Sequence, residues 1–121
     1  MSKHTDGPWF CGQDGFNLGN GVVYARHANG NPKDICHVHG WGADQQANTR
    51  LISATPDLLE ALEEMVSNEE QVEFESWLSD FSPSGDCESV TAQWYESSRY
   101  EDFCLAVEKQ LNAIAKARGE K

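Results

Sequence analysis

Short strand-like runs alternate with turn-forming pairs through the first forty residues of the chain. Asn20-Gly21 and Asn29-Gly30 favour tight turns because Asn and Gly tolerate positive φ, and Asp14-Gly15 is a third pair of this kind. The runs beside these turns cover residues 9–11, 22–26 and 35–39. Pro32 suits the loop between the last two runs, where a missing N–H group costs nothing. This pattern predicts a small antiparallel sheet of three strands.

After residue 42 the spacing of the apolar residues becomes helical. Ala47, Leu51 and Ala54 recur at this spacing from about residue 44, and a break follows at Thr55-Pro56. Thr is favoured at the N-cap of a helix and Pro at its first position, so a second helix is expected to begin there. The apolar stripe of this second helix comprises Leu58, Leu59, Leu62, Met65 and Val66.

Two further helices are expected in the rest of the chain. Ser67 and Glu70 are spaced as a capping box, which predicts a new helix with Phe74, Trp77, Leu78 and Phe81 on its buried face. Residues 82–86 read as a loop, and residues 87–97 are compatible with a helix or a strand. The last helix is predicted over residues 99–117, with Ser98 and Glu101 as its capping box and a stripe of Phe103, Val107, Leu111 and Ile114.

These elements predict an α+β fold in which the N-terminal sheet packs against three to five helices. A three-stranded sheet needs such packing on one face to be stable. The length of 121 residues is typical of a single domain, with a β-rich part over residues 1–42 and a helical, acidic part over residues 43–121. The residues expected in the core are Leu51, Leu58, Leu62, Trp77, Phe103, Val107 and Leu111.

The negative charge of the chain is concentrated in one stretch. The formal net charge is −11, and residues 57–102 hold fourteen of the twenty acidic residues but one basic residue, Arg99. Such a surface repels nucleic acids and anionic membranes and attracts basic protein surfaces. We therefore expect a basic protein partner, no direct binding of nucleic acid and no binding to membranes.

Composition and the N-terminal residues point to the cytoplasm. The sequence has no run of about 18 apolar residues that could cross a membrane, and residues 1–6 contain no apolar signal region. Cytosolic cysteines are kept reduced, so Cys11, Cys36, Cys87 and Cys104 are expected to be free.

Two segments resemble a known group of proteins. Residues 47–62, with the pattern A-N-x-R-L-I-x-A-x-P-D-L-L-E-A-L, resemble a block common in small bacteriophage and prophage proteins. Residues 4–9 resemble the H-T-x-G-P-W start of those proteins, with Asp6 where Pro is usual. The departures at Thr49, Ser53 and Thr55, where Ala is usual, are mild, and the resemblance does not extend over residues 67–121.

The resemblance implies a phage-encoded accessory protein that acts in the host bacterial cytoplasm. Most proteins with this block have no assigned activity. Small acidic phage proteins without enzymatic activity often block host defences such as CRISPR–Cas complexes or restriction nucleases. Many of these anti-CRISPR and DNA-mimic proteins occupy the basic surface that is meant for nucleic acid.

Candidate chemistry is sparse. His37 and His39 share one face of the predicted strand, and with Cys36 they could begin a zinc site to which Cys11 would have to contribute. No C-x-x-C pair or second ligand pair accompanies them, so ordinary strand residues are the favoured reading and no metal or cofactor is predicted. A Cys–His nucleophile has no orienting carboxylate or family signature to support it.

The acidic helices offer the best candidate for a binding site. Glu69, Glu73 and Asp80 fall on one helical face beside the apolar stripe, which could be a solvated surface or a protein-binding face. The residues predicted to contact a partner are the densest run of acids, Glu63, Glu64, Glu69, Glu70, Glu73, Glu75 and Asp80.

Three functional hypotheses follow. The preferred one is a non-enzymatic inhibitor that binds the basic surface of a host defence complex through these acids. The alternatives are a phage structural or assembly protein that acts by self-association and a small metal-dependent enzyme. The oligomeric state is left open by the sequence.

Overall fold

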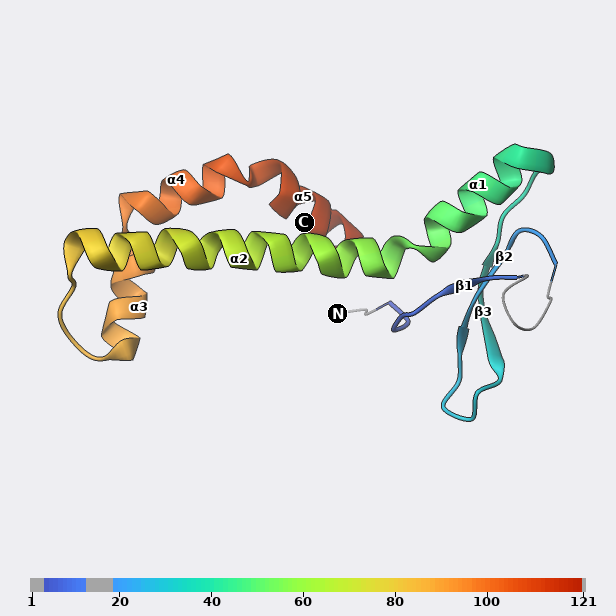
Figure 1. Cartoon of the computed structure of the whole chain (residues 1–121), viewed down its shortest axis with the longest axis horizontal. Helices are drawn as coiled ribbons and strands as arrows, with labels where there is room; N and C mark the ends of the chain where they lie inside the picture. Colours follow the sequence, from blue (N-terminus) through green and yellow to red (C-terminus); the bar gives the residue numbers. More distant parts are fainter. Residues whose placement is uncertain (1–3, 13–18, 121) are drawn as a thin grey trace. The chain divides into compact units, whose positions relative to one another are not determined.

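A computed structural model describes residues 4–12 and 19–120 of the chain (Figure 1). Its described residues form three strands and then five helices, which confirms the predicted α+β class. The strands are β1 (Phe10–Cys11), β2 (Val22–Arg26) and β3 (Pro32–His37), and the helices are α1 (Gly42–Ser53), α2 (Thr55–Phe81), α3 (Cys87–Glu96), α4 (Ser98–Ala106) and α5 (Glu108–Ala117).

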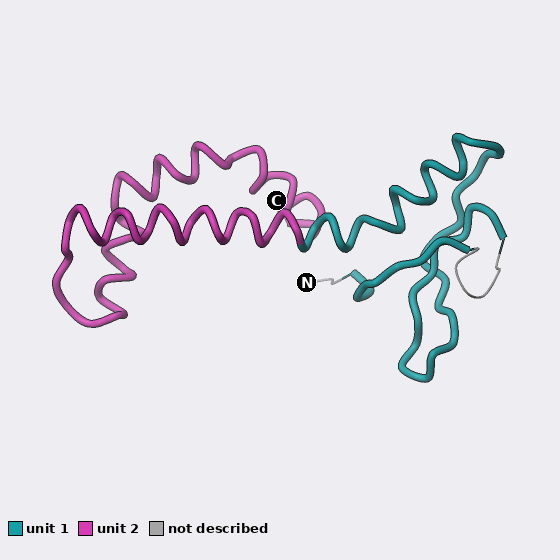
Figure 2. The backbone as a smooth tube through the Cα atoms, in the orientation of Figure 1, with its two compact units in different colours: residues 1–60 teal, residues 61–121 magenta. Residues whose placement is uncertain are grey.

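The chain forms two compact units (Figure 2). Unit 1 comprises residues 1–60 and unit 2 comprises residues 61–121, so the division falls inside α2. The change in composition at residue 42, from β-rich to helical, therefore does not mark the division between the units. That the whole chain behaves as one domain stays a prediction.

The sheet of unit 1 is antiparallel, in the order β1-β2-β3 (Figure 1). Phe10 lies opposite Tyr24, and Cys11 and Cys36 lie opposite Val23 from the two outer strands. An irregularity between Val23 and Tyr24 interrupts the alternation of side chains. Since α1 also packs on β1 and β2, four consecutive residues of the central strand, Val22 to Ala25, are buried.

The predicted turns around the sheet are present where the structure describes them. Gly21 and Gly30 have φ values of +84° and +88°, which Gly adopts without steric cost. Asp14-Gly15 lies outside the described residues. β3 begins at Pro32 and ends at His37, so the strand lies earlier in the chain than the predicted range of residues 35–39. Proline fits the first residue of an outer strand because its missing N–H is not needed there.

The junction between α1 and α2 lies where the sequence predicts it. α1 ends at Ser53 and α2 begins at Thr55, whose Oγ1 donates a hydrogen bond to the carbonyl of Leu51 at 3.1 Å. Residues 57–66 are helical, as expected. The second helix start at Ser67 was wrong, because α2 continues for 27 residues to Phe81. No Pro or Gly interrupts residues 57–81, and Ser67 lies exposed on the helix surface.

The ambiguous stretch 87–97 is mostly helix α3, capped by Asp86, whose side chain accepts a hydrogen bond from the Ser89 N–H at 2.8 Å. The single helix predicted over residues 99–117 was wrong in two respects. Its cap is Ser97, which accepts from the Tyr100 N–H at 3.1 Å, in place of Ser98. It also divides into α4 and α5 at Val107, a β-branched residue with weak helix preference.

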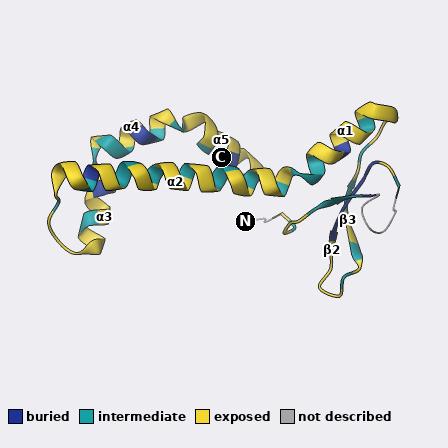
Figure 3. Cartoon of the chain, in the orientation of Figure 1, coloured by how far each residue is buried: buried dark blue, intermediate teal, exposed yellow. Residues whose placement is uncertain are grey.

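Trp94 of α3 is the centre of the aromatic core of unit 2. The centroid of its ring lies 5.5 Å from those of Phe74 and Trp77 on α2 and 5.4 Å from that of Tyr100 on α4. Its side chain is 2% exposed, and its indole N–H donates to the Glu70 carboxylate at 3.2 Å. Figure 3 shows that other buried positions of the helices are few.

The predicted core residues have different outcomes. Trp77 and Phe103 are buried as expected, and Leu62, Val107 and Leu111 are half-buried. The prediction was wrong for Leu51 and Leu58, which are 62% and 55% exposed. Helical spacing identifies an apolar stripe, but burial also needs a second element over it, and within the described part of unit 1 none covers these two side chains.

Removal of the Trp94 ring should destabilise the chain severely. Trp94→Ala is expected to lower the free energy of unfolding by about 3–5 kcal/mol, since a large buried ring is lost and a cavity remains. The matched control is Leu105→Ala on α4, where the side chain is 64% exposed and the expected loss is below about 1 kcal/mol. Urea denaturation of the full chain measures both. Equal losses in the two variants would show that Trp94 is not the centre of the core.

Tyr100 gives the aromatic core a dependence on alkaline pH. A hydrogen bond with Cys104, and secondly burial, raise the pKa of Tyr100 from 10.0 to about 12. The folded state therefore holds the phenol proton more tightly than the unfolded state does. This contribution to stability is complete below pH 10 and is lost as the pH rises toward 12.

Tyr100→Phe should therefore reduce the loss of stability between pH 10 and pH 12, because Phe has no proton to release. Leu105→Ala, at a position of α4 that is 64% exposed and carries no titratable group, is the control and should keep the wild-type slope. The free energy of unfolding is measured by urea denaturation at intervals across this range. Parallel slopes for Tyr100→Phe and the wild type would contradict the assignment.

Candidate functional site

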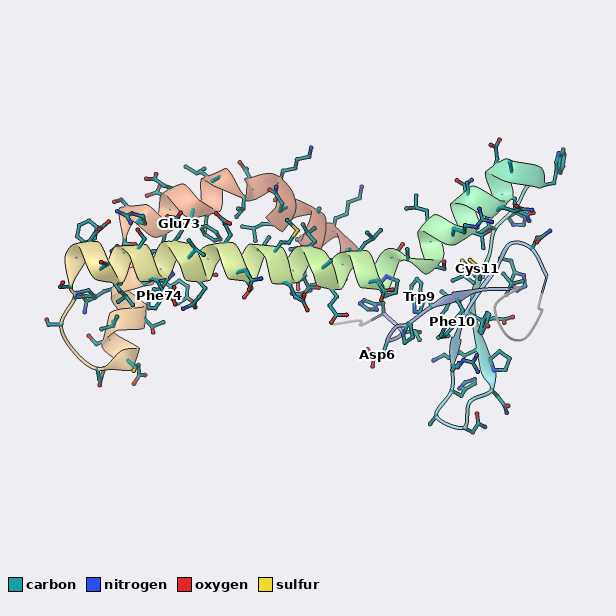
Figure 4. All side chains as sticks on the ribbon, viewed as in Figure 1. Asp6, Trp9, Phe10, Cys11, Glu73 and Phe74 are labelled. Atoms are coloured by element: carbon teal, nitrogen blue, oxygen red, sulfur yellow. The ribbon has the colours of Figure 1, made fainter. Side chains whose placement is uncertain are left out.

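The seven acids predicted to contact a partner all lie on α2 within unit 2, but they do not form one surface. At about 100° per residue, Glu69, Glu73 and Asp80 share one side of the helix. Glu64 and Glu75 lie on another side, more than about 100° away from these. Figure 4 shows Glu73 on the side of α2 toward α4 and Phe74 on the side toward α3. The side of α2 that carries Glu69, Glu73 and Asp80 therefore lies toward α4.

Four of the seven acids are engaged within unit 2. Asp80 accepts a hydrogen bond from the guanidinium of Arg99 at 2.9 Å, and Glu63 forms an ion pair with Arg118. Glu70 accepts from the Trp94 indole. Glu75 accepts a hydrogen bond from the side chain of Gln71 at 3.0 Å. The carboxylates of Asp80, Glu63 and Glu70 link α2 to later segments, which the sequence does not reveal because the partners lie far along the chain. The Gln71–Glu75 bond lies within α2.

Glu64, Glu69 and Glu73 are the three acids of the set whose side chains make no hydrogen bond or ion pair with another described residue. Glu64 and Glu69 are exposed and Glu73 is half-buried. Their carboxylates are consequently available to an external cation. We call them the unpaired acids of α2.

A cleft of about 630 Å³ lies beside two of the unpaired acids. One wall is α2, and the other is formed by α4 and the beginning of α5. Its apolar lining consists of Leu62, Met65, Val66, Phe103, Ala106 and Val107, and its acids are Glu69, Glu73 and Asp102. The sequence predicts an apolar stripe that includes Leu62, Met65 and Val66, and it places Leu62 in the core. It does not predict that this stripe lines an open cleft.

The field around unit 2 is strongly negative. Residues 61–121 carry fourteen acidic residues against five basic ones. Two of the five bases, Arg99 and Arg118, are already paired with acids of α2. A cleft surrounded by charge of one sign focuses the electrostatic potential and raises the local concentration of cations.

The candidate ligands around Cys36 are not brought together. Cys11 and Cys36 lie on β1 and β3 with β2 between them, which separates their backbones by roughly 10 Å. The Cys11 thiol lies 3.3 Å from the Ser53 hydroxyl, and His37 Nε2 lies 3.3 Å from the Asp34 carboxylate. Over residues 4–12 and 19–120, no three His, Cys, Asp or Glu side chains are grouped as a metal site would require. All four cysteines are free thiols.

The described helices differ from membrane-spanning segments. None of them combines the length and the apolar character that crossing a bilayer needs.

Comparison with known proteins identifies the family. The family model described as Salmonella phage P22 protein Y8K6 matches residues 1–121, so the chain belongs to this phage protein family. The expected origin from a phage is thereby confirmed. No curated protein and no solved structure matches the chain.

We predict that the chain does not bind DNA. The basic cluster of Lys116, Arg118 and Lys121 is short, and Arg118 is already paired with Glu63. Phosphate binding needs a broader cationic surface. A gel-shift experiment at physiological salt should show no complex at micromolar protein, and a shifted band under these conditions would contradict the prediction.

Proposed function

We propose that this member of the phage family acts by binding, without catalysis, and that its acidic helical unit covers a basic surface of a host protein. The observation that carries the proposal is the charge of unit 2, where the unpaired acids of α2 extend from a helix that the aromatic core holds in place. The inhibitor hypothesis, in which the target is a host defence complex of CRISPR–Cas or restriction type, is the specific form of the proposal.

The density of negative charge along α2 supports the inhibitor hypothesis. The helix contains nine acidic residues and no basic residue in 27 residues. Two of these acids, Glu63 and Asp80, are paired with arginines, so seven uncompensated charges over a length of about 40 Å give roughly one every 6 Å. One DNA strand carries one about every 3.4 Å, so a groove that binds phosphates would meet charge of the same sign at a lower density on α2.

Defence nucleases are suitable targets because they must present cationic grooves to nucleic acid. A phage protein that covers such a groove would protect the phage genome during infection, in the cytoplasm of the host. The negative field of unit 2 would steer it to the groove and speed association at low ionic strength.

Self-association is the second candidate function, as expected of an assembly protein. Several large apolar side chains of the helices are exposed, including Met65, Val72 and Leu105. Association of two copies would cover such side chains, but it would also bring two strongly negative units together. The charge therefore favours a basic partner over a second copy.

Neutralising the unpaired acids should weaken binding to a defence complex. In the test, the purified host complex binds its DNA in the presence of increasing amounts of the chain. The wild type should displace DNA, and Glu64→Gln/Glu69→Gln/Glu73→Gln should associate about tenfold more slowly at low salt. The difference should shrink above 0.1 M salt, where charges are screened beyond about 10 Å.

The matched control removes the same charge elsewhere in unit 2, at exposed acids on α3 and α5, with Glu88→Gln/Glu96→Gln/Glu108→Gln. It should keep most of the wild-type association rate. Equal rates for the two triple variants would show that α2 is not the contact surface. Failure of the wild type to displace DNA from any of the complexes tested would contradict the inhibitor hypothesis.

A further inference from the structure

The cleft of unit 2 is a groove between two antiparallel helical stripes. The Asp80–Arg99 ion pair joins the end of α2 to the beginning of α4, and the Glu63–Arg118 pair joins an earlier turn of α2 to the end of α5. The two segments therefore run in opposite directions. The lining residues of α2 follow the spacing i, i+3, i+4, i+7 and i+11 from Leu62, which places them along one side of the helix. Those of α4 and α5 follow the same kind of spacing from Arg99 to Gln110.

The two ends of the groove differ in chemistry. Leu62, Met65 and Val66 of α2 lie at the end nearer the Glu63–Arg118 pair, which is also the end of Val107 and Gln110. Glu69 and Glu73 lie at the other end, with Asp102 of α4. The one cation in the lining, Arg99, is already paired with Asp80. Phe103 adjoins Asp102, so apolar lining extends along the groove while the negative charge lies at one end.

We propose that this groove holds a basic amphipathic helix of the partner protein. The inference rests on the proposed function and adds the kind of partner segment that unit 2 recognises. Apolar side chains of the incoming helix would lie on Leu62, Met65 and Val66, and its Lys or Arg side chains would pair with Glu69, Glu73 and Asp102. Amphipathic helices bind hydrophobic grooves in this way, and flexible Met side chains adapt to such ligands.

Charge complementarity selects this occupant over a second copy of the chain. A second copy would bring fourteen acids and five bases of its own unit 2 against the same groove. Its carboxylates would then face Glu69, Glu73 and Asp102 at short range, and like charges in contact are strongly unfavourable. A basic helix supplies the same apolar contacts together with charges of the opposite sign.

The dimensions of the groove define the segment. From Leu62 to Glu73 the lining of α2 spans eleven helical steps, about 16 Å, which corresponds to about three turns of a docked helix. A segment of this length with apolar residues at i, i+3, i+4 and i+7 and with basic residues beside them fits both ends of the groove.

The test uses a synthetic peptide of about 14 residues, which is long enough for about four helical turns. Leu occupies positions i, i+3, i+4 and i+7, which form one face of the helix, and Lys occupies the other positions. A second peptide has the same composition in an order that forms no apolar face. Binding of each labelled peptide to the full chain is followed by fluorescence anisotropy at two salt concentrations. The amphipathic peptide should bind about tenfold more tightly than the scrambled one.

Two single variants place the site. Met65→Lys changes a groove residue that is 69% exposed, and Leu105→Lys makes the same change in charge at a residue of α4 that is 64% exposed and outside the groove. Met65→Lys should weaken binding of the amphipathic peptide about tenfold, and Leu105→Lys less than about twofold. Circular dichroism and urea denaturation confirm that both variants remain folded.

Each outcome decides the proposal. Equal binding of the two peptides, or equal effects of the two variants, would overturn the proposal that the groove is the binding site. The proposed function would still stand, because it requires only an acidic surface that attracts cations. A dimer of the wild type that Met65→Lys dissociates in gel filtration would assign the groove to a second copy. Failure of the amphipathic peptide to bind even at low salt would also overturn the inference, whereas the proposed function is decided separately by displacement of DNA.

Discussion

The packing of Trp94 against α2 and α4 is the interaction on which unit 2 depends. Its ring contacts Phe74 and Trp77 on one helix and Tyr100 on another, and its indole N–H donates a hydrogen bond to the Glu70 carboxylate. Few other residues of the unit are buried. The aromatic core therefore uses one side of α2 and leaves the adjacent side, with Glu69 and Glu73, beside a partly open groove.

The acids of α2 consequently serve two purposes. Some of them stabilise the unit, because Arg99 and Arg118 reach back from the following helices to Asp80 and Glu63. These exposed pairs contribute little energy individually, on the order of 0–1 kcal/mol, but they orient the segments that form the second wall of the groove. Acids without an internal partner can pair with an external cation. The same helix can thus hold the fold and present a binding surface.

Local signals in the sequence predicted much of the fold. The strand at Val22–Arg26, the turns at Gly21 and Gly30, and the break before Thr55 depend on neighbouring residues, and the structure contains all of them. The capping box at Ser67 was misleading because a long helix can continue through a cap sequence, as α2 does here. Exposure of Leu51 and Leu58, and the pairing of Asp80 with Arg99, depend on which elements meet in space. For this reason the sequence identified the acidic helix and the face shared by Glu69, Glu73 and Asp80, but neither the internal pairing of its acids nor the groove.

Hydrogen–deuterium exchange of the full chain, alone and with its bound partner, tests most directly whether the groove side of α2 is the binding surface. The backbone amides of α2 and of α4–α5 that line the groove, over residues 62–73 and 99–110, should exchange more slowly in the complex. The strands of unit 1, over residues 22–37, should exchange at an unchanged rate. Slower exchange confined to residues 22–37 would contradict the account and place the contact on the sheet.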